Sequence, residues 1–190
     1  MRDAGVSMLG ADEAAAAAEQ VGVPAELARL NIFRVLLLQP ETAKAVADLL
    51  LTLLSGRALD HRLREIVIMR VGWVSGSDYE WTQHWGIAQR FGCSEDDLLA
   101  VREWAASDRF DETTRAVLAA TDETLRSGAT SEATLRRCRA LLSDAAVVEL
   151  TLAIGVWSTV AQLTKGLEIP LEDGIESWPP DGVAPRGELR

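Results

Sequence analysis

The sequence has few of the residues on which redox, metal and nucleotide chemistry depend. Cysteine occurs only at positions 93 and 138, and the two form no CxxC pair. Neither a dithiol redox motif nor a zinc motif is therefore visible. The glycine-rich phosphate signatures and the GxSxG nucleophile signature are missing as well. We expect no metal and no cofactor, and reduced thiols in a cytoplasmic protein.

Positive charge and long apolar runs are also scarce. The chain holds 19 Lys and Arg against 29 Asp and Glu, which gives a net charge of −10. Nucleic acids and anionic membranes bind clustered basic residues, so we expect neither as a partner. No uninterrupted apolar run reaches the roughly 18 residues of a membrane span. The acids Asp12, Glu13 and Glu19 are untypical of a secretory leader, and we expect none.

Helical patterns fill most of the chain, and strand patterns are almost absent. We predict an all-α protein with a single domain over residues 1–170 and a Pro- and Gly-containing tail over 171–190, either disordered or wrapped on a neighbouring subunit. Gly155, inside the last apolar helix, predicts the close approach of another helix there. The expected helices cover 12–21, 25–39, 41–54, 60–74, 78–91, a stretch capped by Ser94, 112–126, 131–142 and 144–165. Asp60 is expected to cap the helix over 60–74, and because residues 66–69 are apolar on every face of that helix, we place it centrally.

The stretch LDHRLREIVIMRVGWVSGSDYEWTQH, residues 59–84, carries the candidate chemistry. Ser77, Glu80 and His84 have the i, i+3, i+7 spacing of one helix face. A carboxylate four residues from an imidazole favours the charged ring. Glu65 lies in an apolar helix where an ionised carboxyl requires a partner, for which His84, Tyr79 or a nearby arginine such as Arg70 would serve. The residues alone leave open a plain helix–helix salt bridge and a core histidine.

The same stretch resembles the central segment of the carboxymuconolactone decarboxylase family, which includes the AhpD-like proteins. The likeness is best over residues 59–92 and weaker over 31–170. In the thiol-active branch a Glu is followed by eleven residues and then by Cys-x-x-Cys-x-x-x-His. On this chain the Glu is Glu65 and the His is His84. Ser77 and Glu80 occupy the cysteine positions, and Tyr79 replaces an extra histidine, so thiol peroxidase chemistry is not expected.

The resemblance implies an AhpD-like helical bundle that assembles as a trimer or hexamer. It also implies a cofactor-independent lyase or isomerase that moves a proton on a small oxygenated organic acid or lactone. In that reading Glu65 and His84 transfer the proton and Tyr79 donates to the oxyanion. Four further residues would contact the substrate: Ser77, Glu80, Trp81 and Trp73.

Three alternatives stay open at this point. The chain could be a peroxidase-related AhpD-like protein that uses Cys93. It could be a specialised cyclase or hydratase on the same scaffold. It could also be a non-catalytic binding or assembly subunit. Glu149, in the last apolar helix, is a further acidic candidate that faces either the same cavity or a partner helix.

Overall fold

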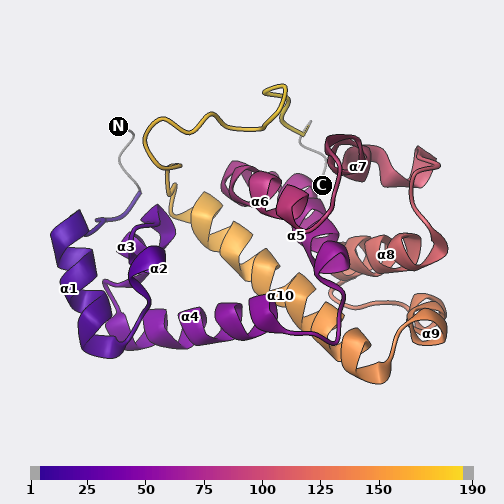
Figure 1. The fold of residues 1–190 in the computed structure, drawn as a ribbon, viewed down its shortest axis with the longest axis horizontal. Helices are drawn as coiled ribbons and strands as arrows, with labels where there is room; N and C mark the ends of the chain where they lie inside the picture. The colour runs from indigo at the N-terminus through magenta and orange to yellow at the C-terminus, as the bar shows by residue number, and fades with distance from the viewer. Residues whose placement is uncertain (1–4, 186–190) are drawn as a thin grey trace. The chain divides into compact units, whose positions relative to one another are not determined.

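The computed structural model describes residues 5–185, and within this range every regular element is a helix (Figure 1). The expected all-α fold class is therefore confirmed. In chain order the elements are α1 (Ala11–Val21), α2 (Ala25–Ala28), α3 (Asn31–Leu36), α4 (Pro40–Ser55), α5 (His61–Ser75), α6 (Asp78–Arg90), α7 (Glu95–Ala100), the 3₁₀ helix η1 (Val101–Ala106), α8 (Glu112–Ser127), α9 (Glu132–Leu141) and α10 (Asp144–Gly166).

Most of the helices from α5 onward begin next to a residue whose side chain caps the helix. Asp60 accepts the backbone N–H groups of Arg62 and Leu63 and starts α5. Serine hydroxyls or an aspartate carboxylate do the same before α6, α7, α8 and α9. Such caps satisfy N–H groups that have no partner within the helix. The predictions of Asp60 and Ser94 as capping residues are both confirmed.

The helix expected over 25–39 is wrong in detail, because the chain breaks at Leu30. Leu30 has an extended backbone, and α2 and α3 lie on either side of it. The side chain of Asn31 explains the break. Its amide donates to the carbonyl oxygens of Pro170 and Leu171, while its backbone N–H donates to Glu172. These bonds to a distant segment outweigh the helix propensity of the stretch.

The chain divides into two compact units. The first contains residues up to Ser55 together with 163–175, and in it α1 packs against α2, α3 and α4. A cavity of about 220 Å³ opens in this unit, with Asn31, Arg34 and Glu172 among its lining residues. Arg34 donates to Asn31 and to the carbonyl oxygen of Leu9. The polar groups around this cavity are thus largely bonded to one another.

The second unit contains residues 56–162 and the chain from residue 176 onward. In it α5 packs against α6, α8 and η1. Nine of the fifteen residues of α5 are buried, among them the apolar run 66–69, which covers every face of the helix. Arg70 fastens α5 to α8 through a bidentate ion pair with Asp122, and it also donates to two carbonyl oxygens of η1. The helix predicted to be central is central in this unit.

The C-terminal segment packs on its own unit as far as the structure describes it. The backbone N–H of Trp178 donates to Thr82, and the carbonyl of Pro179 accepts the indole N–H of Trp81. Asp181 forms a bidentate ion pair with Arg102. The part of the expected tail over 176–185 is therefore ordered by contacts within the chain. Residues 186–190 lie outside the described range.

The last helix, α10, is long and apolar enough to cross a membrane, and 39% of its most apolar stretch is buried inside the protein. A helix in a protein core passes the same test. A Cβ at Gly155 would meet nothing within 4 Å among the described residues, so the helix contact expected there is absent from this part of the chain. Val148 and Leu152 on the same helix are exposed.

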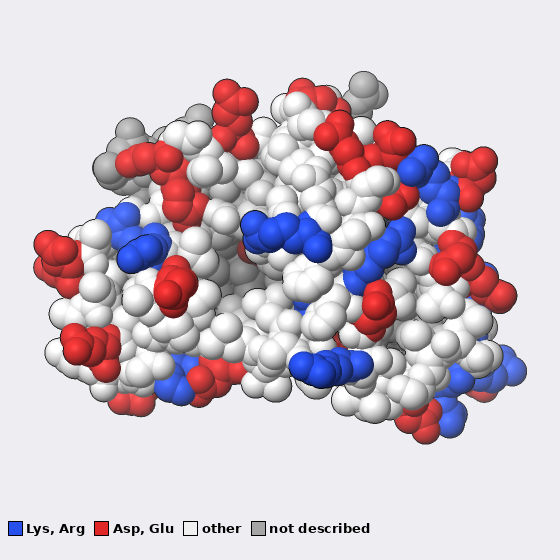
Figure 2. Space-filling model, in the orientation of Figure 1, with Lys and Arg blue, Asp and Glu red and all other residues white. Residues whose placement is uncertain are grey.

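Charged side chains of both signs share the surface. On the face drawn in Figure 2, Lys and Arg residues are interspersed with Asp and Glu residues. Several form exposed ion pairs, such as Arg139 with Asp144 and Arg136 with Glu132. Exposed pairs of this kind contribute between about 0 and 1 kcal/mol each to stability.

Candidate active site

The candidate site forms where α5 and α6 approach most closely. Ser77 caps α6 by accepting the backbone N–H of Glu80, and its own N–H donates to the carbonyl of Gly72 on α5. A Cβ at Gly72 would lie 3.0 Å from the backbone nitrogen of Trp81. Glycine is favoured at this position, because a side chain would force the first turn of α6 to move away by a few tenths of an ångström. This approach places the polar face of α6 against α5.

Glu65 and His84 meet in the buried interior of this unit. The Nδ1 atom of His84 lies 2.8 Å from the Oε2 atom of Glu65, which is fully buried. The other carboxylate oxygen accepts from the guanidinium of Arg64 at 3.0 Å. On the opposite side of the ring, the indole N–H of Trp157 donates to Nε2 at 3.2 Å. A continuous chain of hydrogen bonds thus runs from Arg64 through Glu65 and His84 to Trp157.

The charges of this chain of bonds are coupled. Burial alone would raise the pKa of Glu65, but the bonds and charges of His84 and Arg64 outweigh it and lower that pKa. Burial would lower the pKa of His84, but the bond and charge of Glu65, with the charge of Glu80, raise it. Trp157 acts the other way, because Nε2 accepts a hydrogen bond only while it is unprotonated. The arrangement holds an ionised Glu65 and a proton on Nδ1 of His84.

Arg64 is fully buried, which is rare for an arginine and requires compensating contacts. Its guanidinium contacts Nδ1 of His61 at 2.6 Å and lies over the ring of Phe91 at 5.2 Å from the centroid. His61 stacks on Phe91 in turn, with ring centroids 5.1 Å apart. These contacts compensate for the lost hydration of the guanidinium, and they fix the carboxylate that it holds.

Glu80 differs from Glu65 because it is buried without a hydrogen-bond partner. It is 3% exposed, and among residues 5–185 no group forms a hydrogen bond with its carboxylate. It lies one helical turn before His84. Burial raises the pKa of Glu80 to about 7, and the charge of His84 only partly opposes that rise. A carboxyl in this state gains and loses a proton at neutral pH.

The other predicted site residues lie on α6, at its cap and at the end of α5, and each has its own contacts. Ser77 is fully buried as the cap of α6, and Tyr79 is buried on the neighbouring face of that helix. Trp81 is fully buried, and its indole N–H is bonded to Pro179. Trp73 lies against Trp81 with ring centroids 5.2 Å apart. The two tryptophans thus belong to an aromatic cluster beneath the C-terminal segment, with Arg102 stacked on both rings.

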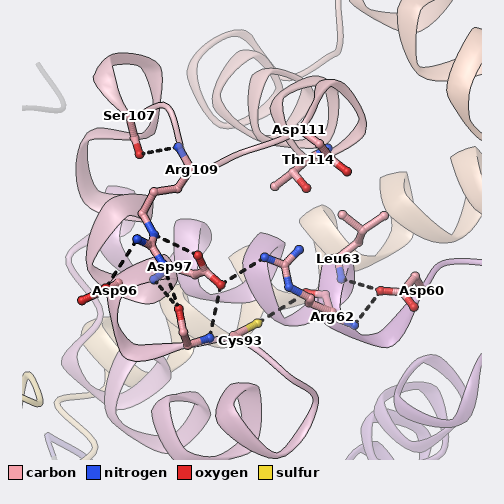
Figure 3. Close-up of polar contacts among 11 residues, drawn as sticks. Asp60, Arg62, Leu63, Cys93, Asp96, Asp97, Ser107, Arg109, Asp111 and Thr114 are labelled. Carbon is pink, nitrogen blue, oxygen red and sulfur yellow. Dashed lines mark hydrogen bonds and ion pairs between the residues drawn. The ribbon is translucent and has the colours of Figure 1, made fainter.

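A second polar group lies near the beginning of α7 (Figure 3). Asp97 accepts from Arg62 at 3.2 Å and from Arg109 at 3.0 Å, and it closes a capping box with Ser94. These contacts outweigh burial and lower the pKa of Asp97. Cys93 lies beside this group, with its thiol 3.9 Å from the carbonyl of Arg62. Burial raises the pKa of Cys93 to about 12, so this thiol is not a thiolate at neutral pH.

Two residues of the site were missed by sequence reasoning, and one candidate lies elsewhere. Arg64 was missed because neighbouring positions on a helix do not normally face each other, and Arg70, named as a possible partner, pairs with Asp122 instead. Trp157 was missed because no spacing links it to His84, 73 residues away. Glu149 accepts the backbone N–H groups of Ala58 and Leu59, so it anchors the loop before α5.

Comparisons with known proteins show a match to a family model and a shared fold. The model of the carboxymuconolactone decarboxylase family matches residues 40–123, which contain Glu65, Glu80 and His84. No curated protein matches the chain. A solved structure from Agrobacterium tumefaciens, of a protein of unknown function proposed as an antioxidant defence protein AhpD, is 26% identical with a TM-score of 0.66. That match covers 70% of this chain and 92% of the other.

Two more distant structures share the fold. The debrominase Bmp8, solved as a cysteine-to-alanine variant in complex with 2,3,4-tribromopyrrole, has a TM-score of 0.75 at 21% identity, covering 88% of this chain and 91% of that one. An AhpD-core, peroxidase-related protein from Ralstonia eutropha JMP134 has a TM-score of 0.74 at 12% identity, covering 91% and 94%. Residues 40–123 thus match the model of the carboxymuconolactone decarboxylase family, and the chain shares the helical fold of AhpD-like structures.

Proposed function

We propose that the protein is a cofactor-independent lyase or isomerase of the carboxymuconolactone decarboxylase type. It moves a proton at a carbon next to a carbonyl in a small oxygenated organic acid or lactone. The bonded chain of Arg64, Glu65, His84 and Trp157 is the observation that carries this proposal. A buried carboxylate–imidazole pair held in one orientation, beside the protonatable carboxyl of Glu80, is an arrangement suited to general acid–base catalysis.

The residues at the α6 positions support proton transfer rather than thiol chemistry. Ser77 and Glu80 stand where the thiol-active branch of the family carries its cysteines, and Cys93 is too weakly acidic to replace them. Tyr79 adds a phenolic donor beside Glu80 in the sequence, and we assign it the role of donor to the developing oxyanion. Bmp8 is a debrominase, so the fold supports catalysis in at least one relative.

A second candidate, a non-catalytic binding or assembly subunit, is favoured by one specific observation. Both carboxylate oxygens of Glu65 and both ring nitrogens of His84 already have partners. A fully satisfied buried network is also what a purely structural element would show. The peroxidase-related and the cyclase or hydratase alternatives use the same fold but have no such observation in their favour.

The experiment that separates these candidates uses His84→Gln. Glu65→Gln is the weaker choice, because it would leave the buried charge of Arg64 without its carboxylate and would destabilise the protein. Wild-type protein is incubated in D₂O with a panel of small unsaturated lactone acids and oxo acids, and deuterium uptake is followed by NMR. We expect His84→Gln to lower the rate on any turned-over compound by on the order of 10² to 10⁴.

The matched control is His61→Gln, which changes the other histidine of the chain. It removes a contact to Arg64 but leaves the Glu65–His84 bond in place. We expect this variant to keep the activity of the wild type within a few-fold. If the wild type turns over no member of the panel, or if activity falls only in proportion to the folded fraction, the non-catalytic reading replaces the proposal.

A further inference from the structure

We propose that Glu80, rather than His84, is the residue of this site that gains and loses the transferred proton, and that His84 acts as a positioning residue held by Glu65 and Trp157. This assignment rests on the proposed function for its chemical meaning. Its physical basis is the contrast between two neighbouring titratable groups on one face of α6. Both ring nitrogens of His84 have hydrogen-bond partners, whereas the carboxylate of Glu80 has none among the described residues.

The first step of the argument concerns His84. Its Nδ1 faces Glu65 at 2.8 Å and its Nε2 accepts from Trp157 at 3.2 Å. A proton added at Nε2 would place two donors against each other and break the Trp157 bond. A proton removed from Nδ1 would leave the ring facing an ionised carboxylate with no hydrogen between them. Either change is costly in a buried site, so the ring keeps its protonation.

The second step concerns Glu80, whose sequence context predicts an ordinary capping role. Ser77 and Glu80 have the Ser-x-x-Glu spacing of a capping box, in which the glutamate accepts the N–H of the capping residue. That N–H instead donates to the carbonyl of Gly72, and no box forms in α6. The carboxyl of Glu80 is thereby released from the helix terminus. It is buried beside His84 with no hydrogen bond to lose when it changes charge.

The third step concerns the charges that face this carboxyl. The titratable group that acts on Glu80 is His84, on the same helix. Glu65 and Arg64 of α5 act on His84 in turn. Arg102 of η1 is engaged with Asp181 and with the rings of Trp73 and Trp81. Burial is the dominant influence on Glu80 and holds its pKa at about 7. Among these groups Glu80 is the one poised to change protonation at neutral pH.

The step that follows is balanced without a cofactor. In a β,γ-unsaturated ligand, the C–H bond at the carbon between the carbonyl and the C=C bond breaks, and its electron pair moves toward the carbonyl oxygen to form a dienolate. The proton forms an O–H bond on the carboxylate of Glu80. Return of that proton to the γ-carbon of the dienolate restores the carbonyl and leaves the double bond between the α- and β-carbons, and Glu80 is again ionised. His84 and Glu65 keep their protonation states throughout, so the charge on these two residues does not change during the step.

The test measures both groups directly and requires no ligand. In protein labelled with ¹³C and ¹⁵N, the Glu80 carboxyl carbon and the His84 ring nitrogens are followed by NMR from about pH 5 to about pH 9. We expect the Glu80 signal to titrate with a midpoint near neutrality and the His84 nitrogens to keep one protonation pattern. Glu80→Gln assigns the signal and removes the transition, whereas Asp97→Asn leaves it unchanged.

The outcomes are decisive in each direction. A Glu80 midpoint at or below about 5, or a His84 ring that changes protonation at neutral pH while Glu80 stays charged, overturns the assignment. A neutral Glu80 midpoint supports it even if no compound of the D₂O panel is turned over, in which case the proposed function alone fails. On a compound that is turned over, Glu80→Gln is expected to lower deuterium uptake by on the order of 10² to 10⁴.

Discussion

Two helices of this protein begin with the same pattern, a serine followed three residues later by an acid. The carboxylate of one acid is hydrogen-bonded, and that of the other is not. At the start of α7, Ser94 and Asp97 bond to each other in both directions and close a capping box. At the start of α6, Ser77 bonds to the backbone of Glu80, but the carboxyl of Glu80 receives nothing in return. Asp97 is also held by two arginines (Figure 3).

The difference arises from one backbone bond outside the pattern. The N–H of Ser94 donates to the carboxylate of Asp97. The N–H of Ser77 lies at the close approach to α5 and donates to Gly72 at 2.9 Å. The same local sequence therefore yields a stabilising cap at the surface and an unpaired acid in the interior. Tertiary contacts decide whether the cap or the unpaired acid forms, and the unpaired acid is the one that can exchange a proton.

The largest expected effect comes from breaking that approach with Gly72→Ala. The added Cβ would lie 3.0 Å from the backbone nitrogen of Trp81 and 3.3 Å from the Cβ of Glu80. Because backbone rather than a flexible side chain is in the way, α6 must shift. We expect the free energy of unfolding to fall by about 2 to 3 kcal/mol, measured by denaturant titration.

Gly155→Ala is the matched control for this substitution, because a Cβ there would meet nothing within 4 Å of the described chain. In an exposed helix interior, alanine is more stable than glycine by about 1 kcal/mol, so this variant should be more stable than the wild type. An equal loss of stability in both variants would contradict the explanation given for Gly72.

A smaller effect of opposite sign is expected for Glu80→Gln. The pKa of Glu80 is raised from 4.5 to about 7, so the folded state binds its proton more tightly than the unfolded state. The contribution of Glu80 to stability is therefore complete below about pH 4.5 and is lost as the pH rises through about 7. The variant should be more stable than the wild type by about 2 kcal/mol at about pH 8 and similar to it at about pH 5.

Asp97→Asn supplies the comparison at the other helix start. The pKa of Asp97 is lowered by Ser94, Arg109 and Arg62, which outweigh burial, so its contribution is present above the ordinary pKa of 3.8 and is lost as the pH falls. The variant should be less stable by about 1 kcal/mol at about pH 7, and this loss should shrink at about pH 3. Two thermal unfolding series against pH, one for each variant, measure both slopes. Slopes of the same sign would show that the two acids are in the same state.

Much of the fold follows from local patterns in the sequence. Residue spacing and composition predict that Asp60 and Ser94 cap their helices. They also predict that α5 is the central helix. The break between α2 and α3 is not predicted, because it depends on Asn31 bonding to residues some 140 positions away. Contacts of that kind leave no periodic trace in a single sequence.

The candidate site shows the same division. The pairing of Glu65 with His84 was expected, because a carboxyl in an apolar helix requires a partner. The pairing with Arg64 and the bond from Trp157 were not, since the first contradicts the usual helix spacing and the second joins distant helices. The resemblance supplied the positions of the site, and only the structure shows that Glu80 is the acid without a hydrogen-bond partner next to the histidine.

The smallest expected effect, none at all, is that of Cys93→Ala on any activity of the protein. Cys93 and Glu80 are both buried acids of the same unit, and burial is the first cause of the raised pKa of each. For Glu80 the result is about 7, where the proton is exchangeable, and for Cys93 it is about 12, where the thiolate is roughly one part in ten thousand at about pH 8. Arg62 lowers the pKa of this thiol, but it does not outweigh burial and the neighbouring acids.

A thiol-reactive dye should therefore modify native protein slowly and react at once only after denaturation, when Cys93 and the buried Cys138 both become accessible. Rapid labelling of the native protein, or peroxide turnover that disappears in Cys93→Ala, would instead make Cys93 the reactive residue and restore the peroxidase-related alternative.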